Sequence, residues 1–131
     1  MAERVCIVSG GNSGIGFELC RGMAAAGFHV VMVSRGAERG QPALEKLQAE
    51  FGDSVEMMLC DMSDLSNIAK LHAEFTAKFD RLDILLNNAG IAECAPMAEI
   101  PLGVLQRALV VNAMAPAVLV REAWDALAVA P

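Results

Sequence analysis

A glycine-rich segment, GGNSGIG at residues 10–16, directly follows an apolar run near the amino terminus. Gly10, Gly14 and Gly16 have no side chains to cover backbone N–H groups at the point where a helix is expected to begin. Such N–H groups and the helix dipole favour a phosphate, and glycine permits close approach of a ligand. The segment predicts a pyrophosphate-binding turn, with a tight turn that binds nothing as the alternative. The candidate binding residues are Ser9, Gly10, Asn12, Ser13, Gly14, Ile15 and Gly16.

The second apolar run, residues 28–33, ends in Ser34 and Arg35 rather than in a carboxylate. In dinucleotide-binding sheets an acidic residue near this position binds the adenosine ribose of NAD. The planar guanidinium of Arg35 suits a 2′-phosphate instead, and Ser34 can donate a hydrogen bond to the same group. The pattern predicts NADP(H) as the cofactor, with a solvated surface side chain as the alternative for Arg35.

Asp61 and Met62 follow a third apolar run, residues 55–59. Ligands of parallel sheets bind at the carboxyl ends of the strands, where Asp61 is expected to lie. Its carboxylate can accept a hydrogen bond from the amino group of adenine. The alternative is that Asp61 caps the helix that follows, for which Ser63 and Asp64 are further candidates.

Apolar runs alternate with amphipathic segments along the whole chain. The expected strands are residues 5–9, 28–33, 55–59 and 82–86. The expected helices are residues 14–26, 42–51, 63–79 and 102–127. Within the first of these helices, the expected apolar face is formed by Ile15, Leu19 and Met23.

Continuously apolar strands separated by such helices are typical of a parallel sheet covered on both faces. We therefore predict a single α/β domain over residues 1–131, with a Rossmann-type doubly wound sheet in the strand order 3-2-1-4. A sheet of this type normally has about six strands. The expected fold is therefore incomplete, and its fourth strand lies at an edge.

The expected last helix carries one polar residue on an apolar stripe formed by Leu105, Leu109, Asn112, Pro116 and Leu119. A buried amide must be hydrogen-bonded. Pro116 has no N–H to donate to the carbonyl of Asn112, so we expect a kink and a free carbonyl there. Asn112 is therefore a candidate functional residue, with an amide that only braces the helix as the alternative.

Three motifs occur in order along the chain, namely SGGNSGIG at residues 9–16, CDM at 60–62 and LDILLNNAG at 82–90. Together they resemble the short-chain dehydrogenase/reductase family, and most of all its retinol-dehydrogenase-like members. The resemblance covers the chain from Val5 onward. It implies an NADP(H)-dependent oxidoreductase that interconverts an alcohol and a carbonyl by hydride transfer. The alternative is a non-catalytic module that binds NADP(H) or another subunit.

The resemblance also implies roles for single residues. Asp61 and Met62 would contact adenine, whereas Asp83 and Asn87 would brace the central sheet. Asn112 would be one of four catalytic residues, and its backbone carbonyl would position a water in a proton relay. The residues implied to line the ribose and nicotinamide side of the cofactor are Asn88, Ala89 and Gly90.

The remaining catalytic residues of the family are a serine and a Tyr-x-x-x-Lys pair. This chain contains no tyrosine, and its last lysine is Lys78. We therefore expect a portion truncated before the catalytic segment and inactive on its own. The apolar residues within 91–96 favour a small apolar alcohol or carbonyl substrate. The family often forms homo-oligomers through its fourth and fifth helices, so a homo-oligomer is a further expectation.

Composition excludes several other classes of protein. The net charge of −6, without a basic run, disfavours nucleic acid as a partner. The four cysteines form no CxxC pair, so we expect reduced thiols and no metal site. No signal peptide and no uninterrupted apolar stretch of about 18 residues is recognisable, so we expect no membrane span and a cytoplasmic location.

Overall fold

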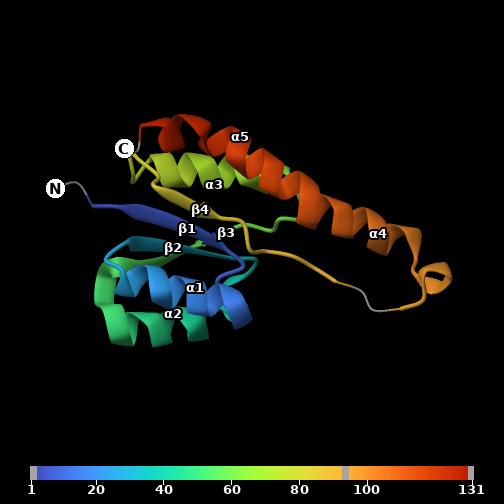
Figure 1. The fold of residues 1–131 in the computed structure, drawn as a ribbon, viewed down its shortest axis with the longest axis horizontal. Coiled ribbons are helices and arrows are strands. Elements are labelled where there is room, and N and C mark those ends of the chain that lie inside the picture. The colour runs from blue at the N-terminus through green and yellow to red at the C-terminus, as the bar shows by residue number, and fades with distance from the viewer. Residues whose placement is uncertain (1–2, 93–94, 130–131) are drawn as a thin grey trace.

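The computed structural model describes residues 3–92 and 95–129. At its centre is one parallel sheet in the order β3-β2-β1-β4, which confirms the expected fold class and strand order (Figure 1). The strands are β1 (Val5–Ser9), β2 (His29–Ser34), β3 (Val55–Leu59) and β4 (Ile84–Leu86). The longer helices are α1 (Gly14–Ala25), α2 (Ala37–Phe51), α3 (Ser66–Thr76), α4 (Leu102–Leu109) and α5 (Ala115–Ala128). The shorter helical segments are η1 (Gly52–Ser54), η2 (Met97–Glu99) and η3 (Val110–Met114).

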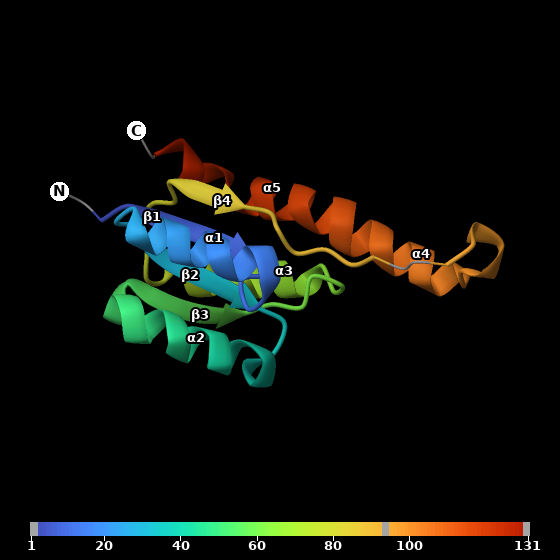
Figure 2. The ribbon, with the colours of Figure 1, turned by 60° about the horizontal axis from the view of Figure 1, so that its bottom comes forward.

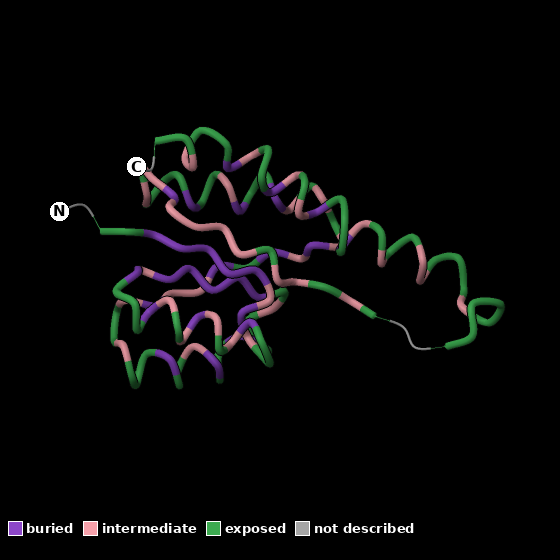
Figure 3. The backbone as a smooth tube through the Cα atoms, viewed as in Figure 1, coloured by how far each residue is buried: buried purple, intermediate pink, exposed green. Residues whose placement is uncertain are grey.

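Helices cover both faces of the sheet, with α1 and α2 on one face and α3 and α5 on the other (Figures 1 and 2). Successive residues of β1 alternate between these layers. Cys6 and Val8 pack with α1 and α2, whereas Val5 and Ile7 pack with α3 and α5. The central strands β1 and β2 are almost wholly buried (Figure 3), as expected for strands with neighbours on every side.

The buried face of α1 differs from the predicted one. The side chain of Ile15 is 75% exposed, and the buried residues of the helix are Gly16, Cys20 and Ala24. A Cβ at position 16 would overlap the carbonyl of Gly10, so the first turn of α1 lies directly against the turn before it. Small residues spaced by four permit this close approach, and the larger apolar residues are displaced to the sides of the helix.

The last helix runs without a break from α4 through η3 to α5 (Figure 1). The irregularity expected near Pro116 as a kink takes the form of a π-helical segment, in which the N–H of Ala115 bonds the carbonyl of Val110. The predicted apolar stripe is wrong at Leu109 and Asn112, which are exposed, whereas Leu119 is buried as predicted. The buried stripe instead consists of Val111, Ala115, Leu119 and Ala123. The π segment changes the number of residues per turn. A buried face inferred from the period of a regular α-helix is therefore wrong here.

Among the described residues, this helix, Leu102–Ala128, is also long and apolar enough to cross a membrane, with a mean hydropathy of 1.6 over an 18-residue stretch within it. The sequence pattern predicts no such segment, because Asn112 and Pro116 interrupt it. Core helices of water-soluble proteins have the same length and composition, so one such helix does not identify a membrane protein. In this fold, one side of the helix packs on the sheet and on α3.

Asp83 joins the start of β4 to the start of β1, as the family resemblance implied. Its Oδ2 accepts a hydrogen bond of 2.8 Å from the N–H of Val5, and its own N–H donates to the carbonyl of Val5 at 2.9 Å. Arg81 donates to the same carboxylate. The strand itself is shorter than expected and begins at Ile84.

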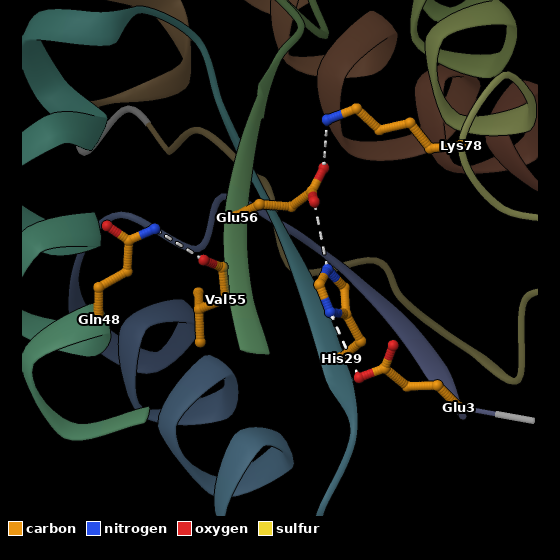
Figure 4. A network of polar contacts seen from close by, with 6 residues as sticks. All are labelled: Glu3, His29, Gln48, Val55, Glu56 and Lys78. Carbon is orange, nitrogen blue, oxygen red and sulfur yellow. Dashed lines mark hydrogen bonds and ion pairs between the residues drawn. The ribbon is translucent and has the colours of Figure 1, made fainter. Parts of the chain in front are cut away.

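Polar side chains also tie the sheet together where β2 begins (Figure 4). His29 lies between two carboxylates, with Nε2 3.2 Å from Glu56 and Nδ1 3.6 Å from Glu3. Glu56 also pairs with Lys78 at 3.0 Å. These contacts connect β3, β2, the segment before β1 and the residues after α3, at the end of the strands away from their carboxyl termini.

Candidate functional site

A cleft of about 300 Å³ lies at the carboxyl ends of β1, β2 and β3, beside the segment that follows β4. The predicted residues that line it are Gly10, Asn12, Ser13, Arg35, Asp61, Met62, Asn88, Ala89 and Gly90. The lining residues that were not predicted are Val33, Arg39, Cys60, Ser63, Ile91, Arg107 and Val111. The predicted residues that do not line it are Ser9, Gly14, Ile15, Gly16, Ser34 and Asn112. The fold therefore brings most of the candidate residues, from distant parts of the chain, to one edge of the sheet.

The turn between β1 and α1 requires its glycines. Gly10 and Gly14 have positive φ angles of 66° and 56°, a region that side chains with a Cβ rarely adopt. A Cβ at Gly16 would overlap both the carbonyl of Gly10 and the side-chain amide of Asn88. The residue at the N-cap of α1, Ser13, makes no side-chain hydrogen bond to the helix. The N–H groups of the first turn are therefore available to an anion.

Ser9 and Asn88 hold this turn against the segment after β4. The buried hydroxyl of Ser9 accepts hydrogen bonds of 3.0 Å from the N–H groups of Asn88 and Ala89. The amide nitrogen of the Asn88 side chain donates to the carbonyl of Gly10 at 3.2 Å. The expectation that Asn87 braces the sheet is wrong, because Asn87 is exposed and Asn88 makes the bracing contact. Asn88 thus supports the turn and also lines the cleft.

Asp61 forms a tight turn rather than a helix cap. Its Oδ1 accepts hydrogen bonds from the N–H of Ser63 at 3.0 Å and from the Ser63 hydroxyl at 2.7 Å. The helix α3 begins at Ser66, whose N–H donates to Oδ1 of Asp64 at 3.0 Å. Of the three candidate caps named from the sequence, Asp64 is therefore the one that supports this helix. The carboxylate of Asp61 faces the cleft.

Positive charge dominates among the ionisable side chains that line this cleft. Three guanidinium groups line it, from Arg35, Arg39 and Arg107. Asp61 is the one carboxylate among its described lining residues. The hydrogen bonds from Ser63 lower the pKa of Asp61 most, and the charges of Arg35 and Arg107 lower it further. The cleft can therefore accept a ligand that carries more than one negative charge.

Ser34 does not face the cleft, contrary to the prediction that it binds a phosphate. The residue is buried, and its hydroxyl donates to the carbonyl of Gly36 at 3.0 Å. A Cβ at Gly40 would approach Ser34 too closely, so α2 packs tightly over this serine. Its side chain supports the connection from β2 to α2, and the exposed Arg35 is the member of the pair that lines the cleft.

Asn112 attaches the last helix to the segment after β4. Its Oδ1 accepts a hydrogen bond of 2.8 Å from the N–H of Ile91, and its Nδ2 donates to the carbonyl of Ile91 at 2.7 Å. The residue is exposed and does not line the cleft, although its neighbour Val111 does. Of the two interpretations made from the sequence, the structural one therefore fits the side chain of Asn112. The side chain braces the segment after β4, however, and not its own helix.

Three described cysteines are buried, and one of them, Cys60, lines the cleft. Burial raises the pKa of Cys6 and of Cys20 to about 12, and that of Cys60 to about 11. These three cysteines are free, as expected for reduced thiols, whereas Cys94 lies outside the described residues. Over residues 3–92 and 95–129, no group of three or more His, Cys, Asp or Glu side chains is placed to hold a metal.

Residues 4–130 match the protein family described as short chain dehydrogenase. This chain belongs to that family. The match covers the glycine turn, Asp61, Asn88 and the last helix, so family membership and the geometry of the cleft concern the same residues.

Individual members of the family are similar over part of their length. The chain is 40% identical over 93 residues to (-)-isopiperitenone reductase of Mentha piperita, across 69% of this chain and 30% of that protein. RhlG of Pseudomonas aeruginosa, solved with NADP, has a TM-score of 0.88 and 28% identity, over 97% of this chain and 49% of that one. L-sorbose reductase of Gluconobacter frateurii, solved with NADPH and L-sorbose, has a TM-score of 0.88 and 27% identity, over 96% and 48%. The chain therefore spans less than half of these short-chain dehydrogenase relatives.

Two lining arginines of this short-chain dehydrogenase were not predicted from its sequence. Arg39 lies in the first turn of α2, which starts at Ala37 and not near Pro42 as expected. A correct helix start would have placed Arg39 beside Arg35. Arg107 lies far along the chain in α4, and no local pattern marks it as part of a site near β3.

Proposed function

We propose that this chain binds NADP(H) in the cleft and forms the nucleotide-binding portion of an oxidoreductase that interconverts an alcohol and a carbonyl compound. The observation that carries the proposal is a cleft lined both by three arginines and by Gly10, Asn12 and Ser13, the residues that lead into the uncapped start of α1. The solved relatives in complex with NADP and with NADPH support it. A dinucleotide with an additional phosphate has the negative charges that these groups would bind.

Each part of the cleft would hold a different part of the cofactor. The first turn of α1 would bind the pyrophosphate, and Arg35 with Arg39 would bind the 2′-phosphate. Asp61 would accept a hydrogen bond from the adenine amino group, and Asn88 would lie toward the ribose and nicotinamide. When bound, the nicotinamide supplies or accepts the hydride. The residues of this chain bind and orient the cofactor for that transfer.

Asn112 would affect the reaction by positioning neighbouring groups. Its side chain holds the backbone of Ile91 beside the cleft. In the family that the chain belongs to, the backbone carbonyl at this position orients a water in a proton relay, and we propose the same for this chain. The π segment around Asn112 supports this role, because such segments occur frequently at functional sites.

Calorimetric titration with NADPH and NADH tests the choice of cofactor. We expect tighter binding of NADPH. In Arg35→Met, affinity for NADPH should fall by about ten-fold or more, because charge-assisted hydrogen bonds to the phosphate are lost, whereas affinity for NADH should change little. Arg121→Met is the matched control, since Arg121 is an exposed arginine of α5 that does not line the cleft. Binding of neither cofactor to folded wild-type protein would refute the proposal, and equal losses for both would refute the role of Arg35.

Turnover by the 131-residue chain is a separate test. Reduction of a carbonyl needs a proton for the developing alkoxide, and the tyrosine that the family uses as its general acid has no counterpart in this sequence. We expect NADPH binding without steady NADPH oxidation when ketone substrates are added. Sustained oxidation, followed by absorbance at the nicotinamide band, would contradict this expectation.

A further inference from the structure

Arg107 reaches the cleft from a helix that is not held there by its own core packing. No side chain of α4 is buried. The helix is placed by the next segment, where Val111 is buried in the core and Asn112 makes its two hydrogen bonds to Ile91. Arg107 lies one turn before Val111, and both line the cleft. The burial of Val111 and the hydrogen bonds of Asn112 therefore position the exposed Arg107 at the edge of the cleft.

The surroundings of Arg107 differ from those of the other two arginines. Arg35 follows β2, and Arg39 lies in the first turn of α2, a helix that covers one face of the sheet (Figure 2). Arg107 belongs to the layer on the opposite face, where Val111 and Met62 pack in the same apolar cluster. Both of these apolar residues also line the cleft. The part of the cleft near Arg107 therefore has apolar walls, whereas the part near Arg35 is suited to a phosphate.

Asp61 completes this part of the cleft. Its carboxylate lies between the two parts, close enough to both Arg35 and Arg107 for their charges to lower its pKa. A carboxylate, two apolar walls and a guanidinium form a set that fits a flat heteroaromatic ring with an exocyclic amine. The carboxylate can accept a hydrogen bond from the amine, and a guanidinium plane stacks well on nucleobases.

We propose that Arg107 closes the adenine end of the cleft by stacking its guanidinium on the adenine ring of the bound nucleotide. This inference rests on the proposed binding of NADP(H) in the same cleft. It separates the three arginines by task, with Arg35 and Arg39 selecting the 2′-phosphate and Arg107 binding the part that NADPH and NADH share. Arg107 is thus a determinant of affinity for adenine nucleotides and not of the preference between the two cofactors.

Replacing Arg107 with methionine and with lysine tests the proposal in the full 131-residue chain. Methionine keeps an apolar stem and removes the guanidinium, whereas lysine keeps the charge and removes the planar group. We expect Arg107→Met to weaken NADPH, NADH and 5′-AMP by the same factor, about five-fold, and Arg107→Lys to recover little of the loss. The loss should persist at about 0.5 M salt, because a stacked contact is screened less than a distant charge. Arg121→Met should bind all three ligands as the wild type does.

Several outcomes would overturn the inference. A loss confined to NADPH would make Arg107 a phosphate ligand. Full recovery by lysine, or disappearance of the loss at high salt, would reduce its effect to charge alone. Unchanged affinity in Arg107→Met, in protein whose circular dichroism matches that of the wild type, would exclude contact with the ligand. Failure of the wild-type chain to bind NADPH would instead refute the proposed function, so the two results are distinguishable.

Discussion

At the scale of single residues, the side chains around the glycine turn combine structural and binding roles. The amide of Asn88 donates to the carbonyl of Gly10 and also lines the cleft, so the group that shapes the turn borders the ligand space. Ser9 and Ser34 are buried and bond to backbone groups, although their types alone predicted ligand contacts. A hydroxyl near the end of a strand can bond either a ligand or the backbone. Because these two hydroxyls are buried, they bond the backbone.

Gly16→Ala should destabilise the fold and impair cofactor binding together. The new Cβ would overlap the Gly10 carbonyl and the Asn88 amide, so the turn or the helix must shift. Overpacking of this kind costs about 1–3 kcal/mol in free energy of unfolding. Urea unfolding would measure the stability, and NADPH titration would measure the binding.

Gly22→Ala is the matched control for Gly16→Ala. Gly22 lies in the same helix and is exposed, and a Cβ added there would meet no atom within 4 Å beyond its chain neighbours and the backbone of its own helix. Alanine has the higher helix propensity, so this variant should be more stable than the wild type by up to about 1 kcal/mol. Equal stability changes in the two variants would show that the close approach at Gly16 is not the cause.

At the scale of elements, the last helix departs most from a regular pattern. A π segment at Val110–Met114 precedes Pro116, and the buried stripe through Val111 and Ala115 follows from that local change. The amide pair between Asn112 and Ile91 lies at the same place. The helix is therefore attached to the loop after β4 at the point where its hydrogen-bond pattern changes.

Asn112→Ala should loosen this attachment without unfolding the chain. Two hydrogen bonds to the backbone of Ile91 are lost at an exposed site, so the free energy of unfolding should fall by about 1 kcal/mol. Hydrogen exchange should show faster exchange of the Ile91 amide, whose acceptor has been removed. Asn87→Ala, at a neighbouring exposed asparagine, should leave that amide unchanged. Unaltered protection of Ile91 in Asn112→Ala would contradict the bracing role.

At the scale of the whole molecule, burial differs between the central sheet and the last helix. The central strands are buried, whereas much of α4 and α5 is exposed (Figure 3). Several of the exposed residues of these helices are large and apolar. Leu102, Leu109 and Trp124 are 69%, 63% and 65% exposed. Apolar surface of this extent favours association, in agreement with the expectation of a homo-oligomer, which stays a prediction.

Stability of the whole fold should fall in acid through Asp83. Hydrogen bonds from Arg81 lower the pKa of this carboxyl most, and the N–H of Val5 lowers it as well. A lowered pKa in the folded state gives stability that is complete above the unfolded pKa of about 3.9 and is lost as the pH falls through the folded value. The difference in free energy of unfolding between wild type and Asp83→Asn should therefore be constant from about pH 7 to about pH 5 and narrow below about pH 4.

Urea unfolding at a series of pH values would measure this difference. Asp53→Asn, at an exposed carboxylate of η1, serves as the control for the loss of one negative charge. A difference for Asp83→Asn that stays the same down to about pH 2 would show that ionisation of Asp83 does not contribute to folding.

The sequence by itself determined the glycine turn and the places of Arg35 and Asp61, because each depends on residues close together in the chain. It also determined the fold class and the strand order, because the alternation of strands and helices and their right-handed crossovers leave few arrangements of the sheet. The tertiary structure alone decided which face of α1 is buried, that Asn88 rather than Asn87 braces the turn, and that Arg107 borders the cleft. These outcomes depend on how closely segments distant in sequence approach one another. A periodic pattern gives the direction of side chains within one element but does not give the distance to the next.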